Sequence, residues 1–173
     1  MKKTILLAAI TGLIVVAPAY AGGHAKPQPT AAEQMAEQQK ADEAAMLQMQ
    51  ISMTQAKRQA IVAENIVLSP ESAEAFWELY REFSNARAKI AEKEWKLLIR
   101  FRDNFDNLTE EQAKSLLDDH LKIDQESRLL RKRYLPRFRR ILTEKQTLAY
   151  FQIENKMDAI MDYEIAQTVP LAR

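Results

Sequence analysis

The sequence predicts an all-α protein, and two features of its composition carry that prediction. All three glycines lie at or before Gly23, so residues 24–173 contain none. Tight hairpin turns between strands and glycine-rich phosphate loops both depend on glycine, so both are disfavoured there. The same region is rich in Ala, Glu, Gln, Lys, Arg, Leu and Met, which are the strongest helix formers.

Residues 1–21 have the pattern of a bacterial secretory signal peptide. Lys2 and Lys3 form a short basic start, an apolar run follows, and Ala19-Tyr20-Ala21 is an Ala-x-Ala cleavage site. The apolar run is shorter than the roughly 20 residues that span a membrane. We therefore expect cleavage after Ala21, a periplasmic location, and no insertion of the mature chain into a membrane.

The composition of the remaining chain excludes several classes of function. It has no cysteine, so disulfides, thiolate nucleophiles and cysteine-ligated zinc sites are impossible. Loss of Lys2 and Lys3 changes the net charge from +1 to −1, which gives no reason to expect nucleic-acid binding. We find no Ser/His/Asp set, no paired-carboxylate cleft and no nucleotide loop. The sequence therefore predicts a protein that is not an enzyme and needs no cofactor.

The expected elements follow one another along the chain. Residues 22–30 contain two glycines and two prolines and are expected to form a disordered linker. A Gln/Met-rich helix should cover 31–64, and a helical domain 65–167, before a short tail over 168–173. Within that domain Ser69 and Pro70 should start a helix that runs to the DNFDN stretch after residue 102. Two further helices should end near Ile141 and Ala166.

A pentapeptide of the form Leu-Thr-x-x-Gln occurs twice, as LTEEQ from residue 108 and as LTEKQ from residue 142. In each copy the threonine is expected to be a helix N-cap, and the glutamine three residues later should reach back to the cap N–H. The leucine before the cap can pack on the first turn. LSPES from residue 68 is a degenerate third copy. The motifs therefore predict two helix starts. Their capping residues are Leu108, Thr109 and Gln112 in the first copy and Leu142, Thr143 and Gln146 in the second.

The expected helices are too long for one compact globule, because 35 residues span about 50 Å. Apolar residues recur along each at helical spacing, which favours an extended hairpin with coiled-coil-like seams. We expect about four helices and a curved dimer. The stripe in the third helix is Leu116, His120, Ile123, Leu130, Tyr134, Phe138 and Ile141.

The two motifs, the leader, the lack of cysteine and the helical chain resemble the periplasmic LTXXQ-motif family of Spy-like and CpxP-like proteins. The resemblance covers about residues 68–166. It implies a long-helix hairpin that dimerises into a cradle. It also implies an ATP-independent chaperone or an envelope-stress adaptor, with metal sensing in some members. The partners would be unfolded or folded envelope proteins.

A basic run over 128–140 carries seven Lys or Arg and no acid. It could form a mixed basic and apolar face that holds clients, or it could pair with Glu71, Glu74, Glu78 and Glu82 across the hairpin. Pro136 lies in this run and should either kink the third helix or end it. The candidate client-binding residues are Arg131, Arg133, Tyr134, Arg137, Phe138 and Arg140.

Metal sensing is the weaker alternative. Met46, Met49 and Met53 share one helical face, and thioethers bind Cu(I), although a packing or client-binding face is the commoner explanation. His120 could join a copper or zinc site, but a histidine within the helix seam is the commoner arrangement. A scaffold or regulator of one envelope partner is the remaining alternative to a chaperone.

Overall fold

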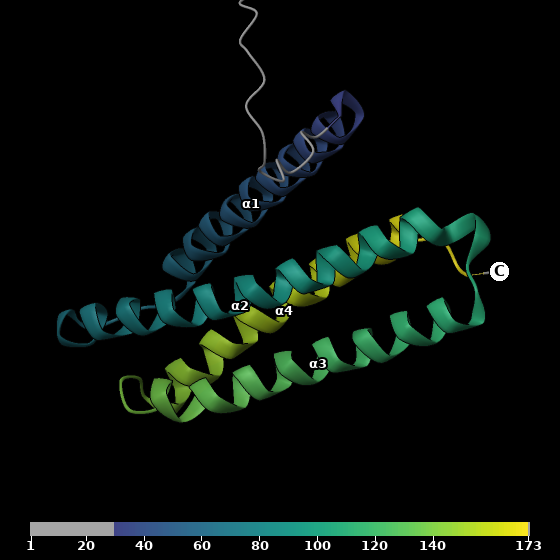
Figure 1. Cartoon of the computed structure of the whole chain (residues 1–173). Coiled ribbons are helices and arrows are strands. Elements are labelled where there is room, and N and C mark those ends of the chain that lie inside the picture. Colours follow the sequence, from purple (N-terminus) through teal and green to yellow (C-terminus); the bar gives the residue numbers. More distant parts are fainter. Residues whose placement is uncertain (1–29, 173) are drawn as a thin grey trace, which may run out of the picture.

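The computed structural model describes residues 30–172, and within that range it contains four α-helices and no strand (Figure 1). The all-α class predicted from the sequence is confirmed. The expected signal peptide and the linker up to residue 29 lie outside the described residues. The elements are α1 (Ala31–Asn65), α2 (Pro70–Asn104), the 3-10 turn η1 (Phe105–Asn107), α3 (Glu110–Phe138) and α4 (Glu144–Thr168).

Helices α2 and α3 form the antiparallel hairpin that the sequence predicts. The rings of Phe83 and Tyr134 meet across it with their centroids 5.3 Å apart. Nearer the turn, Arg100 Nη1 lies 2.6 Å from Asp119 Oδ2. The DNFDN stretch ends α2 and forms η1, so the turn falls where the sequence places it.

The most tightly packed part of the core lies at the end of the hairpin away from η1. Phe76 at the start of α2 and Phe138 at the end of α3 are both fully buried. Tyr150 of α4 packs against both, with ring centroids 5.5 Å from Phe76 and 4.5 Å from Phe138. Val62 and Ile66 complete this cluster from the end of α1. The last turns of α1 therefore belong to the same core as the domain predicted for residues 65–167.

The first half of α1 projects away from the other helices (Figure 1). Residues 31–46 are all exposed, whereas Arg58 and Val62 further along the helix are buried. Leu47 is the one buried residue before Arg58. Helix α1 is therefore anchored mainly near residue 58, and most of its N-terminal half is exposed.

Three capping boxes start helices, and two of them are the predicted motifs. Thr109 accepts the backbone N–H of Gln112, and Thr143 accepts that of Gln146, while each glutamine accepts the N–H of its threonine. The sequence analysis missed the third box, formed by Thr30 and Glu33 at the start of α1. Ser69 is the N-cap of α2, but its side chain makes no cap hydrogen bond.

Helix α3 ends earlier than the sequence suggested. It stops at Phe138, two residues after Pro136, and not near Ile141. Pro136 lies inside the last turn of α3, so the helix ends close to this proline, as the second of the two expected alternatives had it. The placement of His120 in the apolar seam was wrong, because His120 is exposed while Leu130 and Ile123 are buried.

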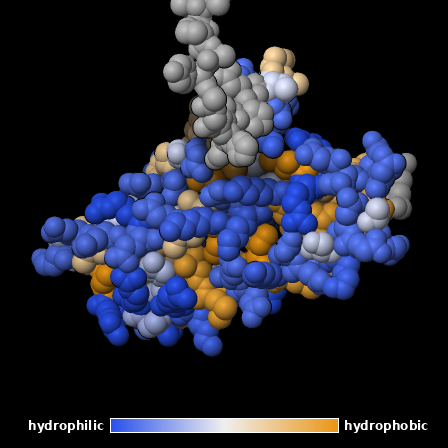
Figure 2. Space-filling model, viewed as in Figure 1, coloured by the Kyte–Doolittle hydropathy of each residue, from blue (hydrophilic) through white to orange (hydrophobic). Residues whose placement is uncertain are grey.

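The surface is mainly hydrophilic, with apolar patches in the region between α2 and α3 in the view of Figure 2. Several large apolar side chains are exposed outside the core. Those used below are Met35, Met46, Met49 and Met53 on α1, Leu121 on α3 and Leu148 on α4.

Candidate functional site

A groove lies between the C-terminal end of α3 and the N-terminal half of α4, with a volume of about 650 Å³. Basic side chains form much of its wall, and aliphatic and aromatic groups form its floor. We call it the α3–α4 groove. Its lining residues are Arg131, Lys132, Leu135, Arg139, Glu144, Lys145, Thr147, Leu148 and Phe151.

Two of the four cations in the groove are neutralised by carboxylates. Arg131 Nη2 lies 3.2 Å from Asp158 Oδ2, and Arg139 Nε lies 3.2 Å from Glu144 Oε2. The other two are exposed lysines without an ion-pair partner among residues 30–172. They are Lys132 and Lys145, and they leave the groove with uncompensated positive charge.

The apolar floor connects the groove to the core. Phe151 is half-buried, and its ring packs edge-on against fully buried Phe138, with centroids 5.8 Å apart. Leu148 is 61% exposed at the same site. An exposed leucine beside a packed aromatic ring offers apolar area to a ligand without requiring the core to open.

The predicted client-binding residues are divided between this groove, the core and the open surface. Arg131 lines the groove. Tyr134 and Phe138 are buried at 8% and 0% exposure, so their assignment to a client-binding surface is wrong. They lie four residues apart and both contact Phe83 of α2, which places them on the inner side of α3. Arg133 and Arg140 are exposed, outside the groove.

Arg137 shows that the proposed charge pairing across the hairpin is real at one position. Its Nη2 lies 2.7 Å from Glu82 Oε2, and its guanidinium stands 4.9 Å from the centre of the Tyr134 ring. The hydrogen bond to Glu82 raises the pKa of Arg137 further above its ordinary value. The other three acids expected on this face, Glu71, Glu74 and Glu78, form no ion pair with the basic run among the described residues.

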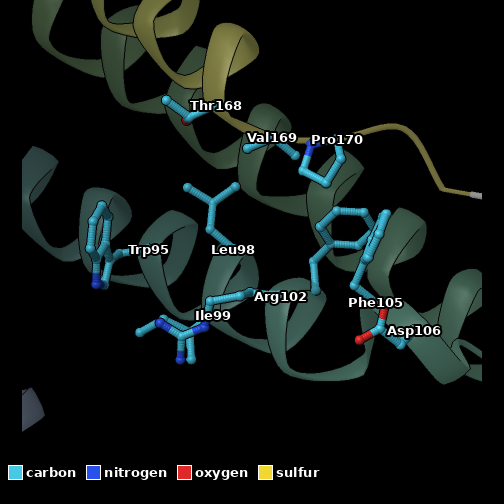
Figure 3. A pocket seen from close by; sticks show the side chains of 10 residues that line it. Trp95, Leu98, Ile99, Arg102, Phe105, Asp106, Thr168, Val169 and Pro170 are labelled. Carbon is cyan, nitrogen blue, oxygen red and sulfur yellow. The ribbon is translucent and has the colours of Figure 1, made fainter.

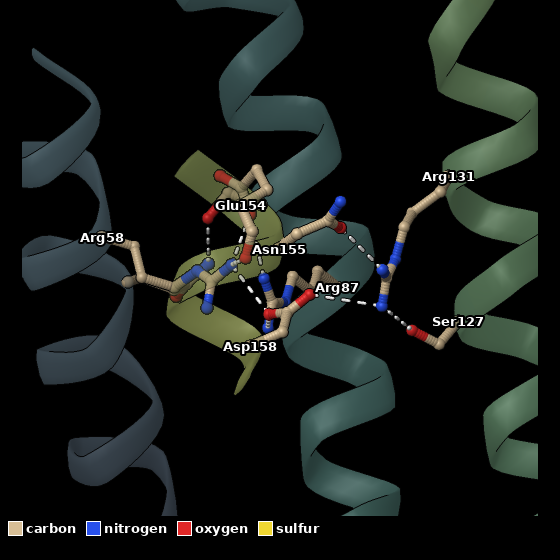
Figure 4. Close-up of polar contacts among 9 residues, drawn as sticks. Arg58, Arg87, Ser127, Arg131, Glu154, Asn155 and Asp158 are labelled. Carbon is tan, nitrogen blue, oxygen red and sulfur yellow. Dashed lines mark hydrogen bonds and ion pairs between the residues drawn. The ribbon is translucent and has the colours of Figure 1, made fainter. Parts of the chain in front are cut away.

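A buried network of charges joins all four helices (Figure 4). Glu154 and Asp158 of α4 both contact Arg58 of α1 and Arg87 of α2, and Asp158 also contacts Arg131 of α3. Arg58 Nη2 lies 3.0 Å from Asp158, and Arg87 Nη1 lies 3.0 Å from Glu154. Arg58 and Glu154 are only 7% and 3% exposed, so the network is a structural junction rather than a surface feature.

The burial of Glu154 changes its acidity. Removal from water raises its pKa to about 7, although the positive charges of Arg87 and Arg131 act in the opposite direction. Asp158 adds to the increase because two neighbouring carboxylates repel one another when both are ionised. A carboxyl that titrates near neutral pH at a four-helix junction makes the stability of that junction depend on pH.

The sequence analysis did not find this network, although part of the signal was present. Glu154 interrupts the apolar stripe of the fourth helix, between Ile153 and Met157. A charged residue in such a position points to a buried partner. The identity of the partner, Arg58, could not be read from the sequence because the two residues are 96 positions apart.

A second cavity, with a volume of about 330 Å³, lies near the η1 turn (Figure 3). Trp95, Leu98 and Phe105 face Val169 and Pro170 of the C-terminal segment across it. The short tail predicted for residues 168–173 therefore contributes Thr168, Val169 and Pro170 to one wall of an apolar pocket.

The candidate metal-binding residues do not form a ligand set with carboxylates or histidine. Met46, Met49 and Met53 are exposed on α1, and His120 is exposed on α3. Among residues 30–172, no three His, Cys, Asp or Glu residues lie close enough to hold a metal ion.

Comparisons of the chain with known protein families, curated proteins and solved structures give no match. None of the helices in the described part of the chain combines the length and hydrophobicity of a membrane-crossing segment.

Proposed function

We propose that this protein is a non-enzymatic binding protein of the periplasm, an ATP-independent chaperone or envelope-stress adaptor. It holds unfolded or partner proteins on its helical surface. The expected leader and the resemblance of the LTEEQ and LTEKQ motifs to the LTXXQ family support the location and the class of function.

The observation that carries the proposal is the composition of the α3–α4 groove. Two lysines without partners stand beside an apolar floor on which Leu148 is exposed. Unpaired cations speed the encounter with acidic segments of a client, and the apolar floor then retains the side chains that an unfolded chain exposes. The methylene stems of Lys132 and Lys145 add apolar area at the rim.

Suppression of client aggregation tests this function. The purified protein should reduce light scattering by several unrelated unfolding proteins, and the effect should weaken as salt concentration rises. Leu148→Asp should abolish protection because it places a charge on the floor of the groove. Leu121→Asp is the matched control, since Leu121 is 57% exposed on α3 outside the groove and should tolerate the same change.

The breadth of the effect separates a chaperone from a scaffold. A chaperone protects several clients, whereas a scaffold for one envelope protein protects none and captures a single partner. Equal protection by the wild type and the Leu148→Asp variant, with both folded by circular dichroism, would remove the groove from the mechanism.

A further inference from the structure

The N-terminal half of α1 is a second largely exposed surface. We call residues 31–50 the arm. All of them are exposed except Leu47, and the helix extends beyond the other three in Figure 1. The helix propensity of its residues alone gives an isolated helix in water little stability, because most helical stability in proteins comes from the packing of one face. An exposed helix of this length therefore implies a binding partner for one of its faces.

The arm carries a stripe of methionines that continues into the next turn of α1. Spacings of eleven, three and four residues place these side chains on one face, since each residue advances by 100°. The same helical geometry turns the buried residues of α1, Leu47, Arg58 and Val62, away from this face. The stripe therefore faces solvent and does not pack in the core. Its members are Met35 (74% exposed), Met46 (63%), Met49 (57%) and Met53 (49%).

The charge of the arm is opposite to that of the α3–α4 groove. The arm has four acids, Glu33, Glu37, Asp42 and Glu43, against the single base Lys40. Its net charge is therefore −3. In the groove the two arginines are neutralised by Asp158 and Glu144, so Lys132 and Lys145 leave it with a net charge of +2.

We propose that the arm of one copy docks in the α3–α4 groove of a second copy of the chain. Met46 and Met49 would lie on the apolar floor at Leu148, since flexible thioethers fit irregular apolar surfaces well. Asp42 precedes Met46 by one helical turn and shares its face, so its carboxylate would approach the two unpaired lysines.

The structure favours docking of the arm in the groove of a second copy over docking in the groove of its own chain. Helix α1 is continuous, and Arg58 fixes its second half to Glu154 and Asp158. The free end of the arm and the connection between α3 and α4 lie at opposite ends of the molecule in Figure 1. The arm would have to break its own helix to reach that groove, whereas a second molecule needs no such change.

This inference rests on the proposed function, because the groove is the same surface that we assign to clients. An arm in the groove covers the apolar floor when no client is present. A client must then displace it, so client binding and self-association compete for one site. Mass action predicts that clients shift the protein towards its monomer.

Sedimentation equilibrium of the purified protein tests the docking at low ionic strength. We expect association at micromolar concentration. Asp42→Lys should weaken it by about tenfold, because the substitution puts a like charge beside the lysines. Glu37→Lys is the matched control, since it makes the same charge change at a position that helical spacing puts on the side away from the methionine stripe. Adding Lys132→Glu to the Asp42→Lys chain should restore association.

The outcomes distinguish this inference from the function on which it rests. A monomer at all concentrations, or equal association of the Asp42→Lys and Glu37→Lys proteins, overturns the docking. If Leu148→Asp still abolishes client protection in that case, the proposed function stands without it. Association that Asp42→Lys weakens, combined with no protection of any client, would leave the docking intact and refute the chaperone.

Discussion

The side-chain amide of Gln146 donates a hydrogen bond to the backbone carbonyl oxygen of Val67, 79 positions earlier, over 2.7 Å. The carbonyl oxygen of the same side chain accepts the backbone N–H of Thr143 over 3.0 Å. Gln146 therefore caps α4 and ties its start to the connection between α1 and α2. Glutamate could accept the N–H of Thr143 but could not donate to the carbonyl oxygen of Val67, because a carboxylate has no hydrogen to donate. This explains why the repeated motif ends in glutamine.

We predict that Gln146→Glu lowers the free energy of unfolding by about 1 kcal/mol, the usual net value of one hydrogen bond. The substitution keeps the capping box, which accepts Glu as readily as Gln, and removes only the contact with Val67. Urea denaturation measures the change. The control is Glu33→Gln in the box that starts α1, where the hydrogen bonds of the Glu33 carboxylate in the described structure both come from Thr30 of the same box. Equal stability of the Gln146→Glu protein and the wild type would contradict the tether.

We predict that Thr143→Ala costs about 1 kcal/mol of stability, because the N-cap oxygen that accepts the N–H of Gln146 is lost. Ser69→Ala provides the comparison. Ser69 occupies the same position at the start of α2, but its hydroxyl does not accept a backbone N–H. Its removal should leave the thermal midpoint nearly unchanged. Similar losses at the two sites would show that capping is not what the motif supplies.

The acidity of Glu154 predicts how stability changes with pH. The ordinary pKa of this carboxyl is 4.5, and burial raises it to about 7 in the folded protein. The folded state therefore binds this proton more tightly than the unfolded chain. The contribution is fully present below about pH 4.5 and is lost as the pH rises through 7, a decrease of about 3 kcal/mol in the free energy of unfolding.

Comparison with Glu154→Gln isolates this effect, because the variant cannot ionise at that position. Denaturation curves between pH 4.5 and 8 should show a decline in the wild type that the Gln variant lacks. The charged and titratable groups facing Glu154 are retained in both proteins, and they are Arg58, Tyr80, Arg87, Arg131, Tyr150 and Asp158. Parallel curves for the two proteins would rule out Glu154 as the source.

We predict that Arg58→Met destabilises the protein by about 3 kcal/mol, because it leaves the buried carboxylate of Glu154 and the partly buried carboxylate of Asp158 with one cation fewer. Arg100→Met is the control. Arg100 pairs with Asp119 at the surface, where both side chains are more than 40% exposed, and its loss should cost less than about 1 kcal/mol. Hydrogen exchange should locate the effect of Arg58→Met in α1. Uniform loosening of all four helices would contradict a local anchor.

The features that the sequence revealed are those determined by neighbouring residues. Thr143 and Gln146 are three positions apart, so their hydrogen bonds could be predicted from the pentapeptide alone. The hairpin could be predicted because the DNFDN stretch sets the turn and the long helices on either side must then pair. The absence of glycine from residues 24–173 predicted the helical class in a similar way, because tight hairpin turns between strands depend on glycine at particular positions.

The features that were missed depend on the rotation of helices about their axes. The basic run was visible, but Tyr134 and Phe138 turned out to face α2, and the exposed apolar residue beside the lysines is Leu148. A composition count cannot decide which side of a helix meets its neighbour. The pairing of Arg58 with Glu154 adds a second difficulty, since it depends on how α1 and α4 are placed in space.

The contact between Arg58 and Glu154 also determines when the fold can be completed during synthesis. A chain that emerges N-terminus first exposes α1 and the hairpin while α4 is still unmade. Until Tyr150, Glu154 and Asp158 arrive, the rings of Phe76 and Phe138 lack their cover, and the guanidinium of Arg58 lacks both of its carboxylates. The nascent protein thus passes through a stage in which it exposes apolar surface and is prone to aggregate. Interruption of the chain anywhere before about residue 150 would leave it in that stage.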